Sequence, residues 1–140
     1  MPNKSTVEAA KKDLREGKSA STAAGEFVRE EIEHVREGKH GARSPQQAIA
    51  IGLSKARRAG VPLKPPAPGK TSEATRKRSE HDYEKGQSEP KTREDGSTKR
   101  GRARVAALKR EPKSTASHSA LSQQTKRSAR RRGQTVHKTA

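Results

Sequence analysis

Apolar side chains recur with the period of an α-helix in three segments of the first 60 residues. The stripes consist of Val7, Ala10 and Leu14; of Ala20, Ala24, Phe27, Val28, Ile32 and Val35; and of Ala48, Ile49, Ile51, Leu53 and Ala56. Three short helices that pack through these faces are therefore predicted. Glu26, Glu30 and Glu33 lie off the second stripe, so we expect them to face water.

Each predicted helix carries residues that suit its two ends. The expected starts are Ser5 with Glu8 as a capping box, Ser19 or Ser21, and Ser44 followed by Pro45 and Gln47. Glycine follows each helix, at Gly17, Gly38 and Gly60, and glycine readily adopts the left-handed conformation that ends a helix. The sequence of residues 14–18 recurs almost unchanged at 35–39, which predicts that the same helix-ending turn is used twice.

The helical pattern weakens after residue 60. Residues 61–69 are rich in proline and predict a semi-rigid linker, and residues 70–96 mix charges without an apolar period. Residues 97–140 carry only weak helical patches. The predicted fold class is therefore mainly α: a module of about three short helices over residues 1–60, a linker, a disordered mixed-charge segment, and a largely disordered basic tail with transient helix.

Composition argues against a large core. Only 26% of the 140 residues are hydrophobic and 35% are charged, and Phe27 and Tyr83 are the only aromatic residues. Cysteine is absent, which excludes disulfides, thiolate metal sites and cysteine nucleophiles. No apolar segment follows residues 1–5, so we expect no secretory signal, and the longest apolar run, residues 48–53, is far too short to span a membrane. We expect a cytoplasmic protein.

The net charge of +17 is concentrated in the last third of the chain. Residues 1–38 have a net charge of −1, whereas residues 97–140 hold 13 Lys or Arg and one acid, a net charge of +12. This excess is larger than solubility requires and favours a polyanionic partner. The predicted phosphate contacts are Lys99, Arg100, Arg102, Arg104, Lys109, Arg110, Lys113, Lys126, Arg127, Arg130, Arg131 and Arg132.

A second cationic group, formed by Lys55, Arg57 and Arg58, ends the third predicted helix. These residues are candidates for supplementary phosphate contacts. They could equally serve the helix itself, because cations complement the dipole at a helix C-terminus. The three helices could also form a helix-turn-helix motif, but they show no clear set of side chains that would contact the edges of DNA bases.

Two further features narrow the partner. Arg100-Gly101-Arg102 resembles the core of an AT-hook, which lies extended in the minor groove of A·T-rich DNA; Ala103 stands where that motif has proline. Sequence-tolerant single-strand binders and RNA-recognition sheets stack bases on several aromatic rings, which this chain lacks. Duplex DNA is therefore the favoured target, and structured RNA remains an alternative.

No catalytic constellation is visible, so we expect a non-enzymatic protein without a cofactor. His34 and His40 are close in sequence, but no carboxylate or cysteine completes a recognised metal-ligand spacing. We interpret both as exposed histidines near a turn and predict no metal site.

The segments EFVREEI at 26–32, GKHGARS at 38–44 and QAIAIGLSKARRAG at 47–60 resemble a bacterial family of small basic proteins. That family is carried as a domain of unknown function, and some members are labelled plasmid stabilisation protein. The resemblance is close over residues 1–62 and looser in the tail. It implies a bacterial cytoplasm and an association with DNA maintenance, and it offers no active site to carry over.

The predicted function is sequence-tolerant binding of duplex DNA in a nucleoid-associated or plasmid-maintenance role. The N-terminal module is expected either to form a homodimer through residues 20–35 or to recruit a partner. The alternatives are an accessory factor of the ribosome or of structured RNA, and a stress-related interaction protein whose basic tail engages acidic proteins or an anionic membrane.

Overall fold

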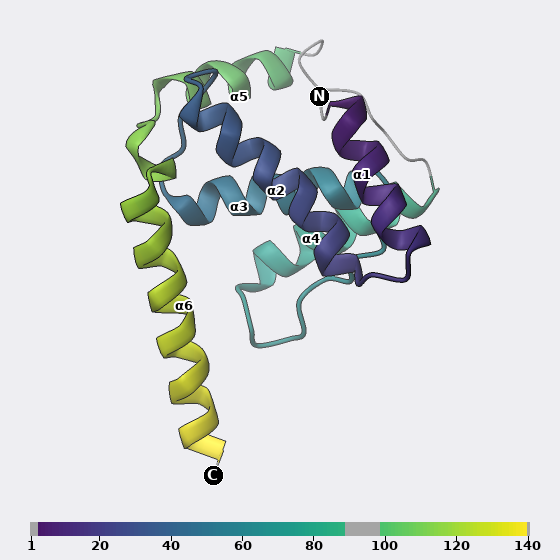
Figure 1. Ribbon diagram of the computed structural model, residues 1–140, viewed down its shortest axis with the longest axis vertical. Helices are drawn as coiled ribbons and strands as arrows, with labels where there is room; N and C mark the ends of the chain where they lie inside the picture. The colour runs from purple at the N-terminus through teal and green to yellow at the C-terminus, as the bar shows by residue number, and fades with distance from the viewer. Residues whose placement is uncertain (1–2, 89–98, 140) are drawn as a thin grey trace.

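The computed structural model describes the backbone of residues 3–88 and 99–139 and the side chains of those residues up to 132. Helices make up most of this part of the chain (Figure 1). They are α1 (Lys4–Arg15), α2 (Ala20–Arg36), α3 (Pro45–Arg58), α4 (Glu73–Ser88), α5 (Lys99–Arg110), the short 3-10 helix η2 (Ser114–Ala116) and α6 (His118–Thr139). Among the described residues, no helix is long and apolar enough to cross a membrane.

Two of the three predicted helix starts are confirmed. The Ser19 hydroxyl accepts a hydrogen bond from the Thr22 amide at 3.2 Å, and the Ser44 hydroxyl accepts one from the Gln47 amide at 3.1 Å. The predicted capping box at Ser5 is wrong, because α1 begins at Lys4, two residues earlier than an N-cap at Ser5 would place it, and the observed N-cap, Asn3, makes no side-chain cap. The carboxylate of Glu30 on α2 instead accepts the Asn3 amide at 2.7 Å, so a tertiary contact caps α1.

The predicted glycine stops are confirmed. Gly17, Gly38 and Gly60 have φ angles of 78°, 80° and 98°, in the left-handed region that side chains disfavour. The next amide after each glycine bonds back to a carbonyl five residues earlier; Lys18 bonds to Asp13 and Lys39 to His34, each at 3.0 Å. The repeated sequence at 14–18 and 35–39 is therefore a repeated Schellman turn.

The main core lies between α1, α2 and α3. Its buried members are Ala10, Ala23, Ala24, Phe27, Ala56 and Val61. Gly52 lets α3 cross α2 closely, because a Cβ at this position would lie 2.6 Å from the Val28 Cα. Since Phe27 is the only large aromatic side chain in an alanine-rich core, it contributes a large share of the buried apolar surface.

The predicted disorder of residues 70–96 is wrong for the described part, 70–88, most of which forms α4; residues 89–96 lie outside the described residues. This helix lacks an apolar stripe and packs on α3 through polar contacts. Asp82 accepts hydrogen bonds from the Ser54 hydroxyl at 2.7 Å and from Arg58 Nε at 2.8 Å. Hydrophobic periodicity could not reveal this helix, because polar and small residues mediate its packing.

The prediction of a largely disordered basic tail is also wrong. Residues 99–110 and 118–139 are helical, and the segment between them is bonded to the α2–α3 loop. The amides of Gly41 and Ala42 donate to the carbonyls of Leu108 and Pro112, each at 2.8 Å. Ala116 is buried in a small second core with Val35, Ala42 and Ala48. Backbone hydrogen bonds and the buried methyl group of Ala116 therefore hold in place a segment that its composition predicts to be disordered.

Candidate functional site

The two C-terminal α-helices carry charge of a single sign. Each contains six Lys or Arg and no Asp or Glu. The predicted phosphate contacts within them are exposed: Lys99, Arg100, Arg102, Arg104, Lys109 and Arg110 on α5, and Lys126, Arg127, Arg130, Arg131 and Arg132 on α6. Lys113, in the turn between the helices, is exposed as well. We call the eleven exposed Lys and Arg residues named above on α5 and α6 the cationic helices surface.

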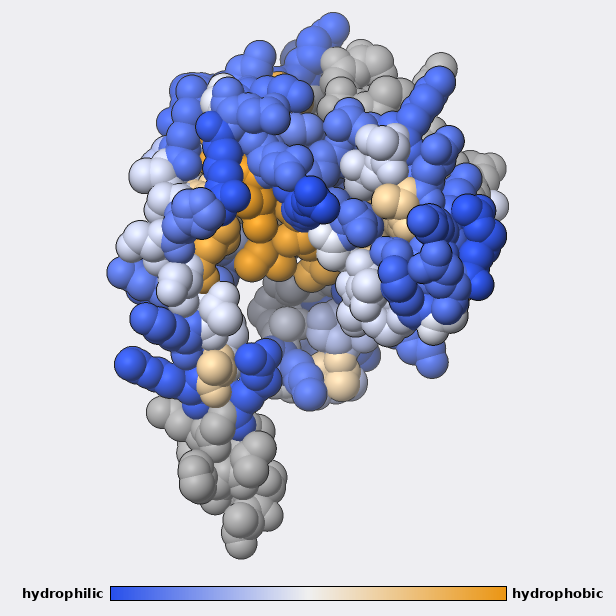
Figure 2. Space-filling view, in the orientation of Figure 1, coloured by the Kyte–Doolittle hydropathy of each residue, from blue (hydrophilic) through white to orange (hydrophobic). Residues whose placement is uncertain are grey.

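The α6 helix projects from the other helices, and hydrophilic side chains dominate its described surface (Figures 1 and 2). Lys126 and Arg130 are four residues apart, as are Arg127 and Arg131, so two rows of like charge run side by side. Like charges at this spacing destabilise an isolated helix by a few tenths of a kcal/mol per pair, and a bound polyanion would remove that repulsion.

The three cations of α3 have partners within the protein. Lys55 Nζ contacts the Glu31 carboxylate, and Arg58 pairs with Asp82. Arg57 is buried and donates from Nε to the Leu63 carbonyl at 3.1 Å. Burial lowers the pKa of the Arg57 guanidinium, and Asp82 opposes this shift. Their use as phosphate contacts stays a prediction, but the structure gives each a role in joining α3 to its neighbours.

The Arg100-Gly101-Arg102 segment is helical, and Gly101 is buried. An AT-hook core is extended, so this segment does not have the backbone on which the resemblance depends. The apolar face of residues 20–35 packs within the chain, with Ala24, Phe27 and Val35 buried. The homodimer stays a prediction, and an interface there would have to use the exposed side of α2 at Arg29 and Glu33.

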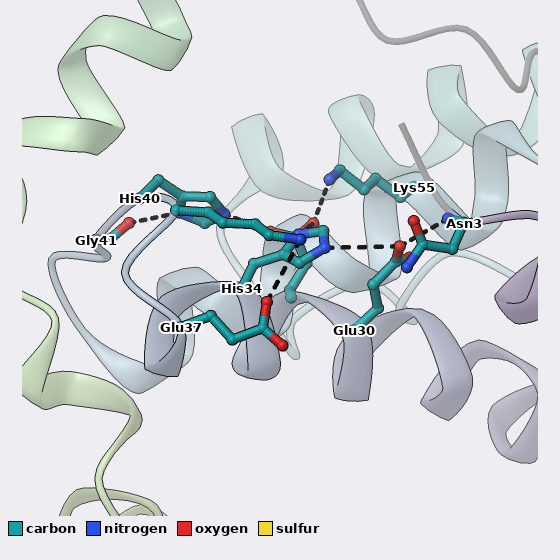
Figure 3. Close-up of polar contacts among 9 residues, drawn as sticks. Asn3, Glu30, His34, Glu37, His40, Gly41 and Lys55 are labelled. Atoms are coloured by element: carbon teal, nitrogen blue, oxygen red, sulfur yellow. Dashed lines mark hydrogen bonds and ion pairs between the residues drawn. The ribbon is translucent and has the colours of Figure 1, made fainter.

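A second cluster, which the sequence analysis missed, lies where the end of α2 faces α3 (Figure 3). Glu30 and Glu31 are both buried, which corrects the expectation that Glu30 faces water. His34 and His40 have side chains only 13% and 14% exposed, so the expectation of exposed histidines is wrong. We call Glu31, His34 and His40 the Glu–His cluster; their potential ligand atoms all lie within 4.8 Å of one another.

The two histidines face the same buried carboxylate. His40 Nε2 lies 3.2 Å from Glu31 Oε2, and His34 Nδ1 lies 3.8 Å from Glu31 Oε1. The 3.2 Å approach has ion-pair distance without hydrogen-bond geometry, since Oε2 has no hydrogen-bond partner. Lys55 Nζ contacts the other carboxylate oxygen, Oε1.

The far nitrogen of each ring also faces an oxygen. His40 Nδ1 is 2.9 Å from the Gly41 carbonyl, and His34 Nε2 is 3.7 Å from Glu30 Oε1. Burial lowers the pKa of His34, and the neighbouring Glu31 and Glu30 only partly oppose this shift. A neutral His34 ring is therefore favoured, which leaves one nitrogen with a lone pair.

One part of this cluster was available from the sequence. Glu31 and His34 are three residues apart, and that spacing places them on one side of a helix. His40 and Lys55 could not be assigned to the same place, because the turn at Gly38 and the crossing of α3 over α2 bring them there.

The chain was compared with family models, with curated proteins and with solved structures, and none of the three comparisons gave a match. The resemblance to small basic bacterial proteins therefore stays a prediction, and any functional proposal depends on the geometry and charge described above.

Proposed function

We propose that this protein binds duplex DNA with little sequence preference through the cationic helices surface. The supporting observation is the charge on α5 and α6. The Lys and Arg side chains of residues 99–132 on these helices are exposed, and neither helix contains Asp or Glu. Guanidinium groups match phosphate oxygens in a bidentate manner, and their binding releases the counterions condensed on the polyanion.

Because α5 and α6 are already helical, binding to DNA should cost them less conformational entropy than it would cost a disordered tail. A disordered tail would lose conformational entropy on binding, whereas preformed helices have already lost most of the backbone part. The 22 residues of α6 extend over about 33 Å at 1.5 Å per residue. A projecting helix of this length can present several cations to successive phosphates of one duplex.

The α1–α3 region supports this function indirectly. The Gly41 amide bonds to Leu108 in the last turn of α5 and the Ala42 amide bonds to Pro112 just after it, so the end of α5 and the segment that leads into α6 are held at one place. A role in plasmid maintenance or in the nucleoid of a bacterial cytoplasm is part of the same proposal, and the family resemblance is its only support.

The test is DNA binding by the full chain in which Lys126, Arg127, Arg130, Arg131 and Arg132 are replaced by Gln. Glutamine is a good helix former, so α6 should remain helical. Fluorescence anisotropy with a labelled duplex should show that the variant binds at least about 100-fold more weakly at low salt, and that the slope of log affinity against log salt becomes shallower by up to about 4.

The matched control replaces five exposed cations outside the cationic helices by Gln: Lys4, Lys11, Lys77, Arg78 and Lys85. It changes the net charge equally, so it should lose far less affinity if position matters. Equal losses in both variants would mean that net charge alone drives binding, which contradicts the proposal. Stronger competition by ribosomal RNA than by duplex DNA would instead favour the RNA-associated alternative.

A further inference from the structure

We propose that the Glu–His cluster is a binding site for a divalent transition-metal ion of the zinc type, with Glu31, His34 and His40 as ligands. The inference is independent of DNA binding. Imidazole nitrogen and carboxylate oxygen are ligands that Zn²⁺ takes in proteins, at about 2.0–2.2 Å from the ion. Tetrahedral ligand atoms at that distance lie about 3.3–3.6 Å apart. His40 Nε2 and Glu31 Oε2 lie 3.2 Å apart, close to this value, and the potential ligand atoms of all three residues lie within 4.8 Å of one another.

His40 has one ring nitrogen free to bind an ion. Its Nδ1 lies 2.9 Å from the Gly41 carbonyl, and a carbonyl can only accept, so Nδ1 carries the proton. In the neutral ring Nε2 then presents a lone pair to Glu31 Oε2, 3.2 Å away. Two lone pairs at this distance repel unless a cation lies between them. A second proton on the ring or a metal ion would meet that requirement.

Glu31 supplies a buried carboxylate oxygen that lacks a hydrogen bond. Its side chain is fully buried, and Oε2 is one of the few buried side-chain polar atoms of the described residues without a hydrogen-bond partner. A buried carboxylate oxygen without a hydrogen bond is costly, so its position 3.2 Å from His40 Nε2 points to a missing ligand. Lys55 already partners the other oxygen, Oε1, which leaves Oε2 to bind an ion in monodentate fashion.

The ring nitrogens that face away from the proposed ion also have suitable partners. Metal-binding histidines generally direct their other ring nitrogen at a carboxylate or a backbone carbonyl, which fixes the tautomer and the ring orientation. His40 does so with the Gly41 carbonyl, and His34 faces Glu30 at 3.7 Å. The buried Glu30 thus occupies the position of an outer-shell partner.

The Lys55 ammonium opposes binding, because it places a positive charge beside the ion. Three protein ligands leave a fourth position for water. Both features predict an exchangeable ion rather than a closed structural site. The ion would link α2 to the loop that carries His40, and this loop bonds to the turn before η2 through Gly41 and Ala42. Metal loading should therefore strengthen the attachment of the C-terminal helices.

The first experiment titrates ZnCl₂ into chelator-treated full-length protein by isothermal titration calorimetry. One equivalent should bind. Since loss of an outer-shell partner lowers metal affinity by about 10–100-fold, Glu30→Gln should fall in that range, and His34→Gln or His40→Gln should lose more than about 100-fold. The matched control is His81→Gln with His118→Gln, because both residues are exposed, and it should bind as the wild type does.

The second experiment uses unmodified protein, so it does not depend on whether a variant folds. The ring ¹⁵N and ¹H resonances of the five histidines are followed by NMR as Zn²⁺ is added. Those of His34 and His40 should move together and saturate at one equivalent. Absence of binding, shifts spread over all five rings, or binding retained by the His34→Gln/His40→Gln double variant would overturn the proposal.

Discussion

The region formed by α1, α2 and α3 and the region formed by α4, α5 and α6 are held in place by different interactions. In the first, Phe27, Ala24, Ala56 and neighbouring apolar side chains are buried between helices. In the second, attachment depends on the Asp82 hydrogen bonds, on backbone pairing with Gly41 and Ala42, and on a single small core around Ala116.

The difference shows why one region was predicted and the other was not. Apolar burial leaves a periodic pattern in the sequence, because every turn must direct a similar side chain at the core. Attachment through hydrogen bonds requires only a few polar or small residues at the right positions. Such residues occur everywhere in a polar sequence and carry no periodic signal.

The largest effect should come from Phe27→Ala. The side chain is 1% exposed, and its removal would leave a cavity in a core otherwise made mostly of alanine. Guanidinium unfolding should show a loss of about 4 kcal/mol in the free energy of unfolding, enough to unfold much of the protein. Val105→Ala, at a position 42% exposed, should change it by less than about 0.5 kcal/mol.

Gly41→Ala should loosen the attachment of the C-terminal segment without unfolding α1–α3. A Cβ at residue 41 would collide with the Glu111 carbonyl, so the turn between α5 and η2 would have to move away. Hydrogen exchange should show lost protection at residues 108–121 while α1–α3 amides stay protected, with a cost of about 2–3 kcal/mol.

Gly25→Ala provides the matched comparison, because nothing lies within 4 Å of a Cβ at that helical position. It should be neutral or stabilise the protein by up to about 1 kcal/mol. Equal destabilisation by both substitutions would contradict the assigned role of Gly41.

Asp82→Ala should release α4 from α3. The substitution removes the acceptor for both Ser54 and Arg58, and the expected loss is about 1–2 kcal/mol. Amide exchange should accelerate in α4 more than in α1–α3. Glu84→Ala, at an exposed position on the same helix, is the control and should leave the exchange rates unchanged.

The smallest effect on stability should come from Ala129→Pro, which breaks α6 at an exposed position, and α6 is a helix that projects from the other helices. Global unfolding should change by less than about 0.5 kcal/mol, while circular dichroism should show a loss of helix. If helical order organises the cations, DNA affinity should fall about 3–10-fold although no charge is removed. Unchanged affinity would mean that a disordered chain of the same charge serves equally well.

The two candidate sites also differ in how much of each could be predicted from the sequence. The positions of the cationic residues are a property of the sequence, and the structure adds that those of α5 and α6 are exposed on helices. The Glu–His cluster could be predicted only in part. Glu31 and His34 share a helix face by their spacing, but the structure was needed to show that the face is buried and that His40 and Lys55 reach it.

The sequence by itself determined the local features: the serine caps at Ser19 and Ser44, the left-handed turns at Gly17, Gly38 and Gly60, and the strong positive charge of the last third. These depend on backbone conformation and on composition, which neighbouring residues settle. Tertiary structure alone decided that α4 packs on α3, that the C-terminal helices attach to the α2–α3 loop, and that two histidines meet a buried carboxylate. Those contacts join residues whose separation in space depends on how helices cross, which no local pattern records.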